Sequence, residues 1–524
     1  MRTPAPSCPK YRSSGRFLKG LPLSGRCLGN LPRKKSAKRT NTTVRAALAE
    51  RPPKLERKSA EDGKVPYNWQ TEWYPVYITE QMPKDRPMAF TLFDTPLVLF
   101  YDGTGKLSCV EDRCPHRAAK LSEGQIIDGK LECLYHGWQF EGDGSCSKIP
   151  QLTDGAAIPR AACVRTYTVR DRQGVVWVWM GKESEADESK LPYWNDLDME
   201  GFRVDSHIHD LPYDSGILLE NLMDPAHIPI SHDKTDPNGR REDAQALWFD
   251  VTERTDRGFA GGFGMTKPRA DGTVPGFTGR FVAPCVFNSR REWVDKKGNK
   301  VVSLALILCP PTGQGKSRLI IRFGSTLKMP PIPKFFIHSI GCKVFEQDMG
   351  LLSSQNELLV KANQGVKDLY LPLKSSDGWV IEYRKWLDKV GHGMPYYTGY
   401  STFSPPRAPA VVDQAPVGSV AAIAANNPAF GSLGAQYALD PTNRYIRHVV
   451  HCKDCRKSLK TAQTLRSAAL VLAAISGLAG IAAAQKSARI WGAAGAGACL
   501  LVAWGAAKVA ELLTTNFVRD HRKL

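Results

Sequence analysis

The stretches Cys114-Pro115-His116 and Cys133-Leu134-Tyr135-His136 decide how the chain folds around them. Each places a cysteine and a histidine at close spacing, C-x-H first and C-x-x-H second, with sixteen residues between the two. Pairs spaced in this way suit the tips of two loops that together hold one metal centre. The sequence therefore predicts a small domain whose two loops meet at a metal.

The ligand types indicate which metal centre this is. Two thiolates on one iron and two imidazoles on the other are the ligands of a Rieske [2Fe–2S] cluster. A structural zinc site with two Cys and two His is the alternative. Both pairs run in the order Cys then His, Gly137-Trp138 follows the second pair, and the surroundings are β-rich, which favours the cluster. The predicted cluster ligands are Cys114, His116, Cys133 and His136.

The residues around both loops have the pattern of an all-β domain, in which apolar runs alternate with turns such as Asp102-Gly103. Further on, strand-like and helical stretches alternate, which indicates an α+β domain with helices over an antiparallel sheet. We expect the all-β domain over residues 68–181 and the α+β domain over residues 200–440. The runs behind this prediction are Trp73–Tyr77, Leu97–Tyr101 and Val175–Met180, then Ser215–Met223, Val301–Leu308, Leu319–Phe323 and Val344–Ala362.

A second group of potential ligands lies in the predicted α+β domain. Asp224, His227 and His232 form the pattern D-x-x-H-x-x-x-x-H, on a predicted helix that Pro229 distorts. Two histidines and one carboxylate on one face of an iron leave positions open for O₂ and substrate, as in non-haem Fe(II) oxygenases. The pattern alone also fits two unrelated histidines. The cluster motif that precedes it favours iron.

The carboxylate ligand has to come from a distant element. The helix-like run Val344–Leu352 contains Asp348, which we predict to be the third ligand. Glu346 and Glu357 are the alternatives.

Two apolar segments near the C-terminus, Ser467–Ala484 and Ile490–Ala507, carry no charge over eighteen residues each. At about 1.5 Å per residue each just spans a bilayer. We predict a transmembrane hairpin over residues 465–512, with Ala493 and Gly497 where the helices approach. A buried soluble hairpin is the alternative. Basic residues flank the two segments, which favours a membrane hairpin whose two ends lie on the same, matrix-like side of the membrane. Residues 513–524 form a basic tail.

Just before this hairpin, residues 441–462 contain Cys452-Lys453-Asp454-Cys455. A lysine beside paired thiols favours a reactive thiolate, so Cys452 and Cys455 are predicted to be a redox switch. A zinc site that includes the nearby His448 and His451 is the alternative.

The net charge of +19 is concentrated at the N-terminus, where residues 1–50 contain twelve Lys or Arg and one acid, Glu50. This basic, acid-poor composition predicts a transit peptide over residues 1–46, with a disordered basic tail as the alternative. Thr43–Ala47 resembles a chloroplast processing site. No nucleic-acid-binding module is recognisable, so nucleic acid is not an expected partner.

Taken together, residues 69–400 resemble the Rieske non-haem iron oxygenases, in particular the chloroplast branch of pheophorbide a oxygenase and the protochlorophyllide oxygenase-like proteins. Three stretches are most similar to the Rieske proteins associated with the inner-envelope protein translocon: Lys385–Pro395, Asn443–Cys452 and Thr515–Arg522. The resemblance implies a helix-grip (START-like) catalytic domain, with mononuclear iron held by His227, His232 and Asp348. It implies a homotrimer in which Asp224 is the electron-transfer bridge to a neighbouring subunit; a helix-capping carboxylate is the alternative for Asp224.

The resemblance also implies a function. Ferredoxin would donate electrons, O₂ would be the co-substrate, and a tetrapyrrole, in particular a linear chlorophyll catabolite (phyllobilin), would be hydroxylated. The alternatives are oxygenation of pheophorbide a or protochlorophyllide, and a redox-sensing role in chloroplast protein import. Thioredoxin would act on Cys452 and Cys455, and translocon subunits would be further partners. The expected location is the chloroplast inner envelope, with the catalytic domains facing the stroma.

Overall fold

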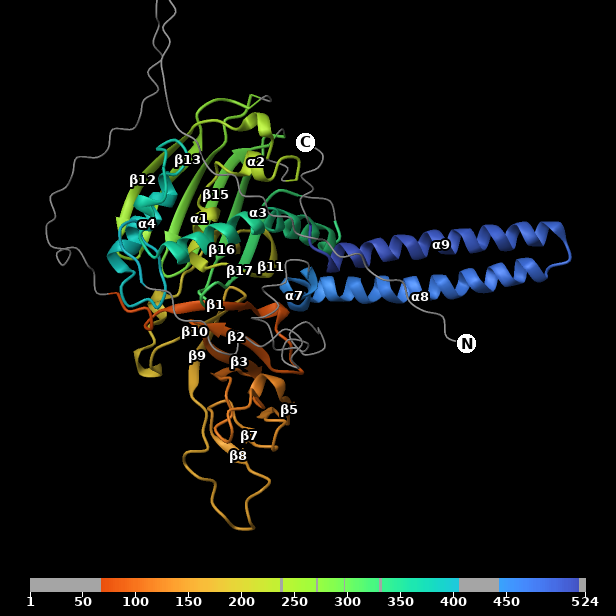
Figure 1. Ribbon diagram of the computed structural model, residues 1–524, viewed down its shortest axis with the longest axis horizontal. Coiled ribbons are helices and arrows are strands. Elements are labelled where there is room, and N and C mark those ends of the chain that lie inside the picture. The colour runs from red at the N-terminus through yellow and green to blue at the C-terminus, as the bar shows by residue number, and fades with distance from the viewer. Residues whose placement is uncertain are drawn as a thin grey trace, which may run out of the picture. The chain divides into compact units, whose positions relative to one another are not determined.

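A computed structural model describes residues 67–235, 239–269, 272–295, 297–328, 332–404 and 443–517 (Figure 1). The predicted transit peptide lies outside the described residues, as does the end of the predicted basic tail from residue 518 onward.

The N-terminal part of the described chain consists of two antiparallel sheets. Strand β10 illustrates how the sequence favours this sheet. Every residue of Val175-Val176-Trp177-Val178-Trp179 is buried, as suits a β-rich strand covered on both faces. The six-stranded sheet has the order β1 (Trp73–Ile78), β10 (Val175–Trp179), β9 (Thr166–Arg172), β4 (Leu107–Glu111), β3 (Thr95–Tyr101) and β2 (Met88–Leu92). The four-stranded sheet has the order β5 (Gln125–Ile127), β6 (Lys130–Glu132), β7 (Gln139–Phe140) and β8 (Cys146–Lys148).

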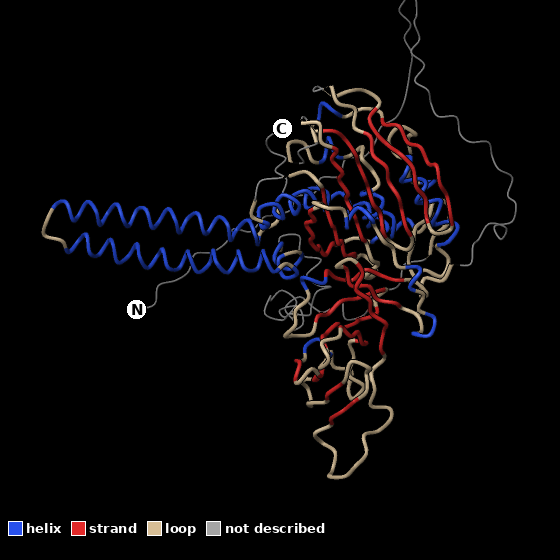
Figure 2. The backbone as a smooth tube through the Cα atoms, turned by 180° about the vertical axis from the view of Figure 1, so that it is seen from behind, coloured by secondary structure: helices blue, strands red, loops and turns tan. Residues whose placement is uncertain are grey.

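A seven-stranded antiparallel sheet follows, and helices cover one of its faces. Helices α1 (Ser215–Leu222), α3 (Lys334–Ala362) and α4 (Gly378–Val390) lie in front of the strands in Figure 1, and the strands lie in front of them in the opposite view of Figure 2. The predicted α+β fold, with its all-β part, is confirmed. The strand order is β11 (Arg203–Leu211), β17 (Ser317–Ser325), β16 (Lys300–Leu308), β15 (Val286–Val294), β14 (Gly276–Val282), β13 (Gly258–Met265) and β12 (Leu247–Thr255).

The helical stretch predicted over Ser215–Met223 is observed as α1, and the distorted helix predicted around the two histidines is a single turn. Helix α1 ends at Leu222, and a separate single turn, α2 (Ile228–Ser231), follows it. Proline offers no backbone N–H and disfavours helical geometry in the residue before it, so Pro225 and Pro229 prevent one continuous helix. His227 and His232 therefore flank a single turn.

One hydrophobic cluster joins the six-stranded sheet to the seven-stranded sheet. Trp177 and Val178 of β10 belong to the same buried cluster as Ile208 of β11, Leu306 of β16 and Ile320 of β17. Burial at such a seam contributes roughly 25 cal/mol per Å² of apolar surface. The two sheets are therefore held together by apolar packing.

The C-terminal helices α8 (Lys453–Ala482) and α9 (Lys486–Thr514) run side by side in Figures 1 and 2 and form the predicted apolar hairpin. Both are long and apolar enough to cross a membrane, and only 17% and 11% of their most apolar windows are buried. This low burial argues against the soluble alternative, because a buried core hairpin would cover those residues. Short helices α7 (Arg444–Arg447) and η9 (Val449–His451) precede α8.

The closest approach of the two hairpin helices differs from the prediction. A Cβ added to Gly492 would lie 2.4 Å from Gly480 Cα, whereas a Cβ on Gly497 would meet nothing within 4 Å. Gly497 is therefore not a contact residue. The turn covers residues 483–485 instead of the predicted 485–489, and the tight contact between Gly480 and Gly492 lies close to it.

Helix α4 is attached to α1 through a buried ion pair, which supports a prediction about stability. Arg384 Nε donates to Glu220 Oε2 at 2.8 Å, and both side chains are buried. Arg384→Met leaves the Glu220 carboxylate buried without its cation, which costs about 3–5 kcal/mol. We expect a clear fall in melting temperature, largely reversed in the double variant Glu220→Leu/Arg384→Met. If Arg384→Met had the same melting temperature as the wild type, the ion pair would not contribute to stability.

Candidate metal centres and active site

The two Cys–His loops have the same backbone geometry. The Cys114 N–H donates to Ala119 O and Ala118 N–H donates back to Cys114 O, at 2.8 and 2.9 Å. Cys133 N–H donates to Trp138 O and Gly137 N–H to Cys133 O, both at 2.8 Å. The fourth residue after each cysteine, Ala118 or Gly137, has a positive φ. The loops therefore form a structural repeat that presents its two Cys–His pairs in equivalent ways.

Side-chain burial separates the two kinds of ligand. Cys114 and Cys133 are buried, whereas His116 is exposed and His136 is half-buried. The two imidazole rings lie 4.3 Å apart between centroids, and His116 stacks on Trp138. Two inner thiols and two outer imidazoles fit the donor set of a Rieske cluster, which places its histidine-bound iron near solvent. The arrangement suits electron entry from an external donor.

A second candidate metal centre brings together His227, His232 and Asp348. His227 Nε2 lies 3.4 Å and His232 Nε2 lies 3.1 Å from Asp348 Oδ2. Asp348 comes from α3, more than a hundred residues after the histidines in sequence. The donor atoms of all three residues lie within 4.8 Å of one another. This set fits one Fe(II) with open positions for other ligands.

The two carboxylates of this centre favour positive charge on the imidazole between them. Burial alone would raise the pKa of Asp348, but the hydrogen bonds from His227 and His232 lower it. Burial would likewise lower the pKa of His227, but Asp224 and Asp348 outweigh burial and raise it to about 10. A divalent metal ion takes the place of that proton when it binds.

The other ring nitrogen of each imidazole faces a side-chain oxygen, which for His232 is a hydrogen-bond partner and for His227 a nearby carboxylate. His232 Nδ1 lies 3.0 Å from Gln347 Oε1, and His227 Nδ1 lies 3.4 Å from Asp224 Oδ2. Such outer partners fix the tautomer and direct Nε2 toward the metal. Asn221 adds a third contact, because its Nδ2 donates to Asp348 Oδ2 at 3.2 Å.

Gln347 gives a direct test of this orientation. Gln347→Ala removes the acceptor for His232 Nδ1, and loss of such a partner typically weakens metal binding about 10–100-fold. We expect the variant to lose iron to a chelator at correspondingly lower concentration. Gln355→Ala is the matched control, because Gln355 also lies on α3 but donates to Tyr370 at 2.8 Å and touches no ligand. Equal iron retention in both variants would contradict the role of Gln347.

Asp224 is not the capping residue of α2, whose N-terminal cap position is His227. Its Oδ1 accepts the Ala226 backbone N–H at 2.8 Å, which holds the carboxylate in place beside His227. Asp224 therefore contacts a histidine of the candidate metal centre without belonging to the three-residue ligand set.

A cavity of about 670 Å³ opens from this centre. Alternate residues of strands β15 and β16 line the cavity. Phe287 of β15 pairs with Ile307 of β16, and Arg291 of β15 pairs with Ser303 of β16. Because alternate strand residues share a face, one surface of the sheet forms the cavity wall. Its aromatic lining consists of Phe263, Phe277, Phe287, Trp293, Phe323 and Phe345. The cavity is large, apolar and in contact with the candidate metal ligands.

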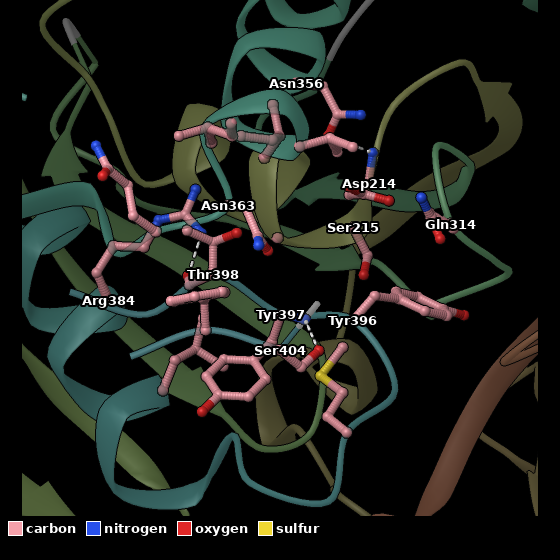
Figure 3. A pocket seen from close by; sticks show the side chains of 18 of the residues that line it. Asp214, Ser215, Gln314, Asn356, Asn363, Arg384, Tyr396, Tyr397, Thr398 and Ser404 are labelled. Atoms are coloured by element: carbon pink, nitrogen blue, oxygen red, sulfur yellow. Dashed lines mark hydrogen bonds between the residues drawn. The ribbon is translucent and has the colours of Figure 1, made fainter. Parts of the chain in front are cut away.

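Two other cavities differ from this one. Figure 3 shows a pocket of about 50 Å³ lined by Asp214, Asn356 and Arg384, in which Asp214 N–H donates to Asn356 Oδ1 at 3.2 Å. This pocket has room for only a few water molecules. A cavity of about 360 Å³ lies on the side of Asp224 and Tyr370 and also contacts His227 and Asp348. Of the three cavities that contact α1 or α3, the 670 Å³ cavity has the most aromatic and aliphatic side chains in its lining.

The sequence-predicted redox pair also has a defined surrounding. Cys452 and Cys455 are both buried at the start of α8. His448 lies beside them, with Nε2 3.4 Å from Cys455 Sγ. His451 turns away and places its Nε2 2.7 Å from Asp210 Oδ2.

Comparison with known proteins agrees with this geometry. A Rieske [2Fe–2S] domain model matches residues 72–168, and a pheophorbide a oxygenase model matches residues 281–365. The fold is similar to that of dicamba monooxygenase bound to 3,6-dichlorosalicylic acid, with a TM-score of 0.52 and 21% identity over 62% of this chain and 97% of that one. The chain is a Rieske non-haem iron oxygenase that carries a [2Fe–2S] cluster and a mononuclear iron.

Sequence relatives narrow this class. Protein TIC 55, chloroplastic, of Pisum sativum is 52% identical over 90% of this chain and 85% of its own length. Pheophorbide a oxygenase, chloroplastic, of Arabidopsis thaliana is 30% identical over 65% of this chain and 67% of its own length. The chain belongs to the pheophorbide a oxygenase family, and within it to the TIC 55 proteins. With its two apolar helices, it is a chloroplast protein associated with a membrane.

Proposed function

We propose that this protein is an inner-envelope Rieske monooxygenase that hydroxylates a tetrapyrrole, most specifically a linear chlorophyll catabolite (phyllobilin). The observation that carries the proposal is the 670 Å³ aromatic cavity beside His227, His232 and Asp348. Ligand pockets commonly have about 300–1,000 Å³, so this one is near the middle of the range and accepts more than a single aromatic ring.

The cofactors are assigned to the two centres described above. Cys114, His116, Cys133 and His136 would hold the cluster, and His227, His232 and Asp348 the iron. When bound, these groups supply one-electron transfer and activation of O₂. Overall, a substrate C–H bond, O₂, two electrons and two protons give a C–OH group and one water molecule.

The cavity lining suits a tetrapyrrole. Its aromatic side chains would pack against pyrrole rings, and they would exclude water from the reacting carbon. Arg269 and Arg291 also line the cavity and match the carboxylate side chains of chlorophyll catabolites. One relative is named pheophorbide a oxygenase, and pheophorbide a is a tetrapyrrole. This name supports the proposed substrate class.

Electron transfer would involve Asp224 and a neighbouring subunit. The carboxylate lies beside His227 and lines the 360 Å³ cavity on the side away from the sheet. We assign Asp224 as the bridge through which the cluster of a neighbouring subunit reduces the iron, in a homotrimer. Ferredoxin is the proposed donor, and exposed Arg117 and Lys120 beside His116 suit an acidic protein of this kind.

The proposed location follows from the same features. Residues 1–46 would direct the chain to the chloroplast, and residues 465–512 would anchor it with residues 68–181 and 200–440 in the stroma. The segment 441–462 would carry the redox switch Cys452 and Cys455, on which thioredoxin would act. The name of a relative in Arabidopsis thaliana, protochlorophyllide-dependent translocon component 52, supports translocon subunits as neighbours.

A panel of substrates tests the proposal. Purified full-length protein is incubated with ferredoxin, its reductase, O₂ and either a phyllobilin, pheophorbide a or protochlorophyllide, and products are identified by mass spectrometry. We expect a gain of one oxygen on the phyllobilin. Turnover of a macrocycle alone would move the assignment to the second candidate, and no oxygen gain on any of the three would favour a redox-sensing role in protein import.

A further inference from the structure

Four buried side chains from three separate segments converge outside the active site. His338 comes from α3, His448 from the link between α7 and η9, and Cys452 and Cys455 from the start of α8. One ligand atom from each lies within 4.8 Å of the others. The hydroxylation proposed above uses none of these four residues, and only the proposed action of thioredoxin involves Cys452 and Cys455.

The separations between these atoms match a tetrahedral metal site. His338 Nδ1 lies 3.4 Å from both Cys452 Sγ and Cys455 Sγ, and His448 Nε2 lies 3.4 Å from Cys455 Sγ. Zinc bonds of about 2.3 Å to sulfur and 2.0–2.1 Å to nitrogen place neighbouring S and N ligands about 3.5 Å apart in a tetrahedron. The three contacts therefore match the edges of a tetrahedron around one zinc ion.

The opposite ring nitrogens have the partners that metal-binding histidines need. His338 Nε2 lies 2.9 Å from Asp205 Oδ2, and His448 Nδ1 lies 2.9 Å from the Ile208 carbonyl. A carboxylate and a backbone carbonyl are the usual outer partners of metal-bound imidazoles. The Cys455 N–H also points at Cys452 Sγ, at 3.4 Å, which stabilises a thiolate at the start of the helix.

We propose that His338, His448, Cys452 and Cys455 bind one structural Zn²⁺. Two thiolates and two imidazoles in a closed, buried tetrahedron form a standard structural zinc set. His207 and His209 also lie close to His448, but that group contains no thiolate, and His207 Nδ1 and His209 Nε2 hydrogen-bond to each other at 2.7 Å. The zinc site considered from the sequence included His451. In the structure His451 Nε2 faces Asp210 instead, and His338 takes its place in the set.

The zinc would connect the membrane hairpin to the catalytic helix. Cys452 and Cys455 lie at the base of α8, and His338 lies on α3, ten residues before Asp348 and hence about 15 Å along the same helix. A tetrahedral ion at this position fixes α8 against α3. It also means that oxidation of the thiol pair would have to displace the metal first.

Metal analysis of the full-length protein in detergent tests the site. We expect about one zinc per chain in addition to iron, and zinc-edge X-ray absorption with two S at about 2.3 Å and two N at about 2.0–2.1 Å. Cys455→Ser and His338→Ala should lose this zinc. Asp348→Ala should keep it, which excludes zinc in the iron site, and Cys342→Ala, a buried cysteine of α3 outside the set, is the matched control.

Alkylation of the wild-type protein provides a second readout that does not depend on any variant. The metal should protect both thiols from alkylation, and removal of zinc by a strong chelator should expose them together. Three results would overturn the proposal: protein prepared with zinc contains no zinc, the zinc has no sulfur ligand, or Cys452 and Cys455 are found as a disulfide. These results leave hydroxylation by the iron site untouched, so the two proposals are tested separately.

Discussion

Asp348→Ala is expected to abolish hydroxylation while leaving the Rieske cluster intact. Asp348 Oδ2 is the atom that both His227 Nε2 and His232 Nε2 approach, at 3.4 and 3.1 Å, so its removal leaves two neutral ligands. The loss should exceed the roughly 10–100-fold effect of removing an outer partner of a metal ligand. Product formation and iron content per chain measure the result.

The cluster serves as the internal control for this variant. The electron paramagnetic resonance signal of the reduced cluster should keep its wild-type intensity, because Cys114 and Cys133 belong to a different core cluster from α3. Glu357→Ala is the matched substitution, since Glu357 also lies on α3 but is exposed and paired with Lys361. Hydroxylation that survives in Asp348→Ala, or fails equally in Glu357→Ala, would remove Asp348 from the iron site.

Asp224→Asn is expected to slow electron transfer to the iron without removing either cofactor. Asparagine can keep the acceptor oxygen for the Ala226 N–H but loses the charge beside His227 Nδ1. We expect a decrease of about 10–100-fold in turnover, the usual size of such an outer-partner effect. Rapid mixing of the reduced protein with substrate and O₂ measures the rate at which the cluster is re-oxidised.

Two controls separate this role from a structural one. Iron content and the reduced-cluster signal should match the wild type in Asp224→Asn. Asp233→Asn, whose carboxylate accepts the Arg241 backbone N–H at 3.1 Å, should turn over normally. Unchanged re-oxidation in Asp224→Asn would show that electrons reach the iron by another route.

The sequence predicted the parts of the molecule that depend on local patterns. The two Cys–His loops, the apolar strands such as Val175–Trp179 and the C-terminal hairpin are all encoded in short stretches, because ligand spacing and hydrophobic periodicity act over a few residues. Asp348 was found by its place in a helical run, and the structure brings it to His227 and His232.

Contacts between distant segments could not be predicted in this way. His338 precedes the cysteine pair by more than a hundred residues, and nothing in its neighbours indicates a ligand. The roles of Gln347 and Asn221 as neighbours of the metal ligands were indicated only weakly by the sequence, through their positions close to predicted ligands. The helix predicted around His227 and His232, which Pro229 was expected to distort, is only a single turn, and the helix contact predicted at Gly497 was wrong because the pairing of two helices depends on their register.

A single turnover with labelled oxygen tests the central claim most directly. Fully reduced protein, free of external donor, is mixed with a phyllobilin and ¹⁸O₂, and product and cluster oxidation are measured together. We predict a product with one ¹⁸O atom, formed as the cluster is re-oxidised and absent in Asp348→Ala. Re-oxidation of the cluster with no labelled product from any tetrapyrrole would contradict the assignment of this protein as a tetrapyrrole hydroxylase.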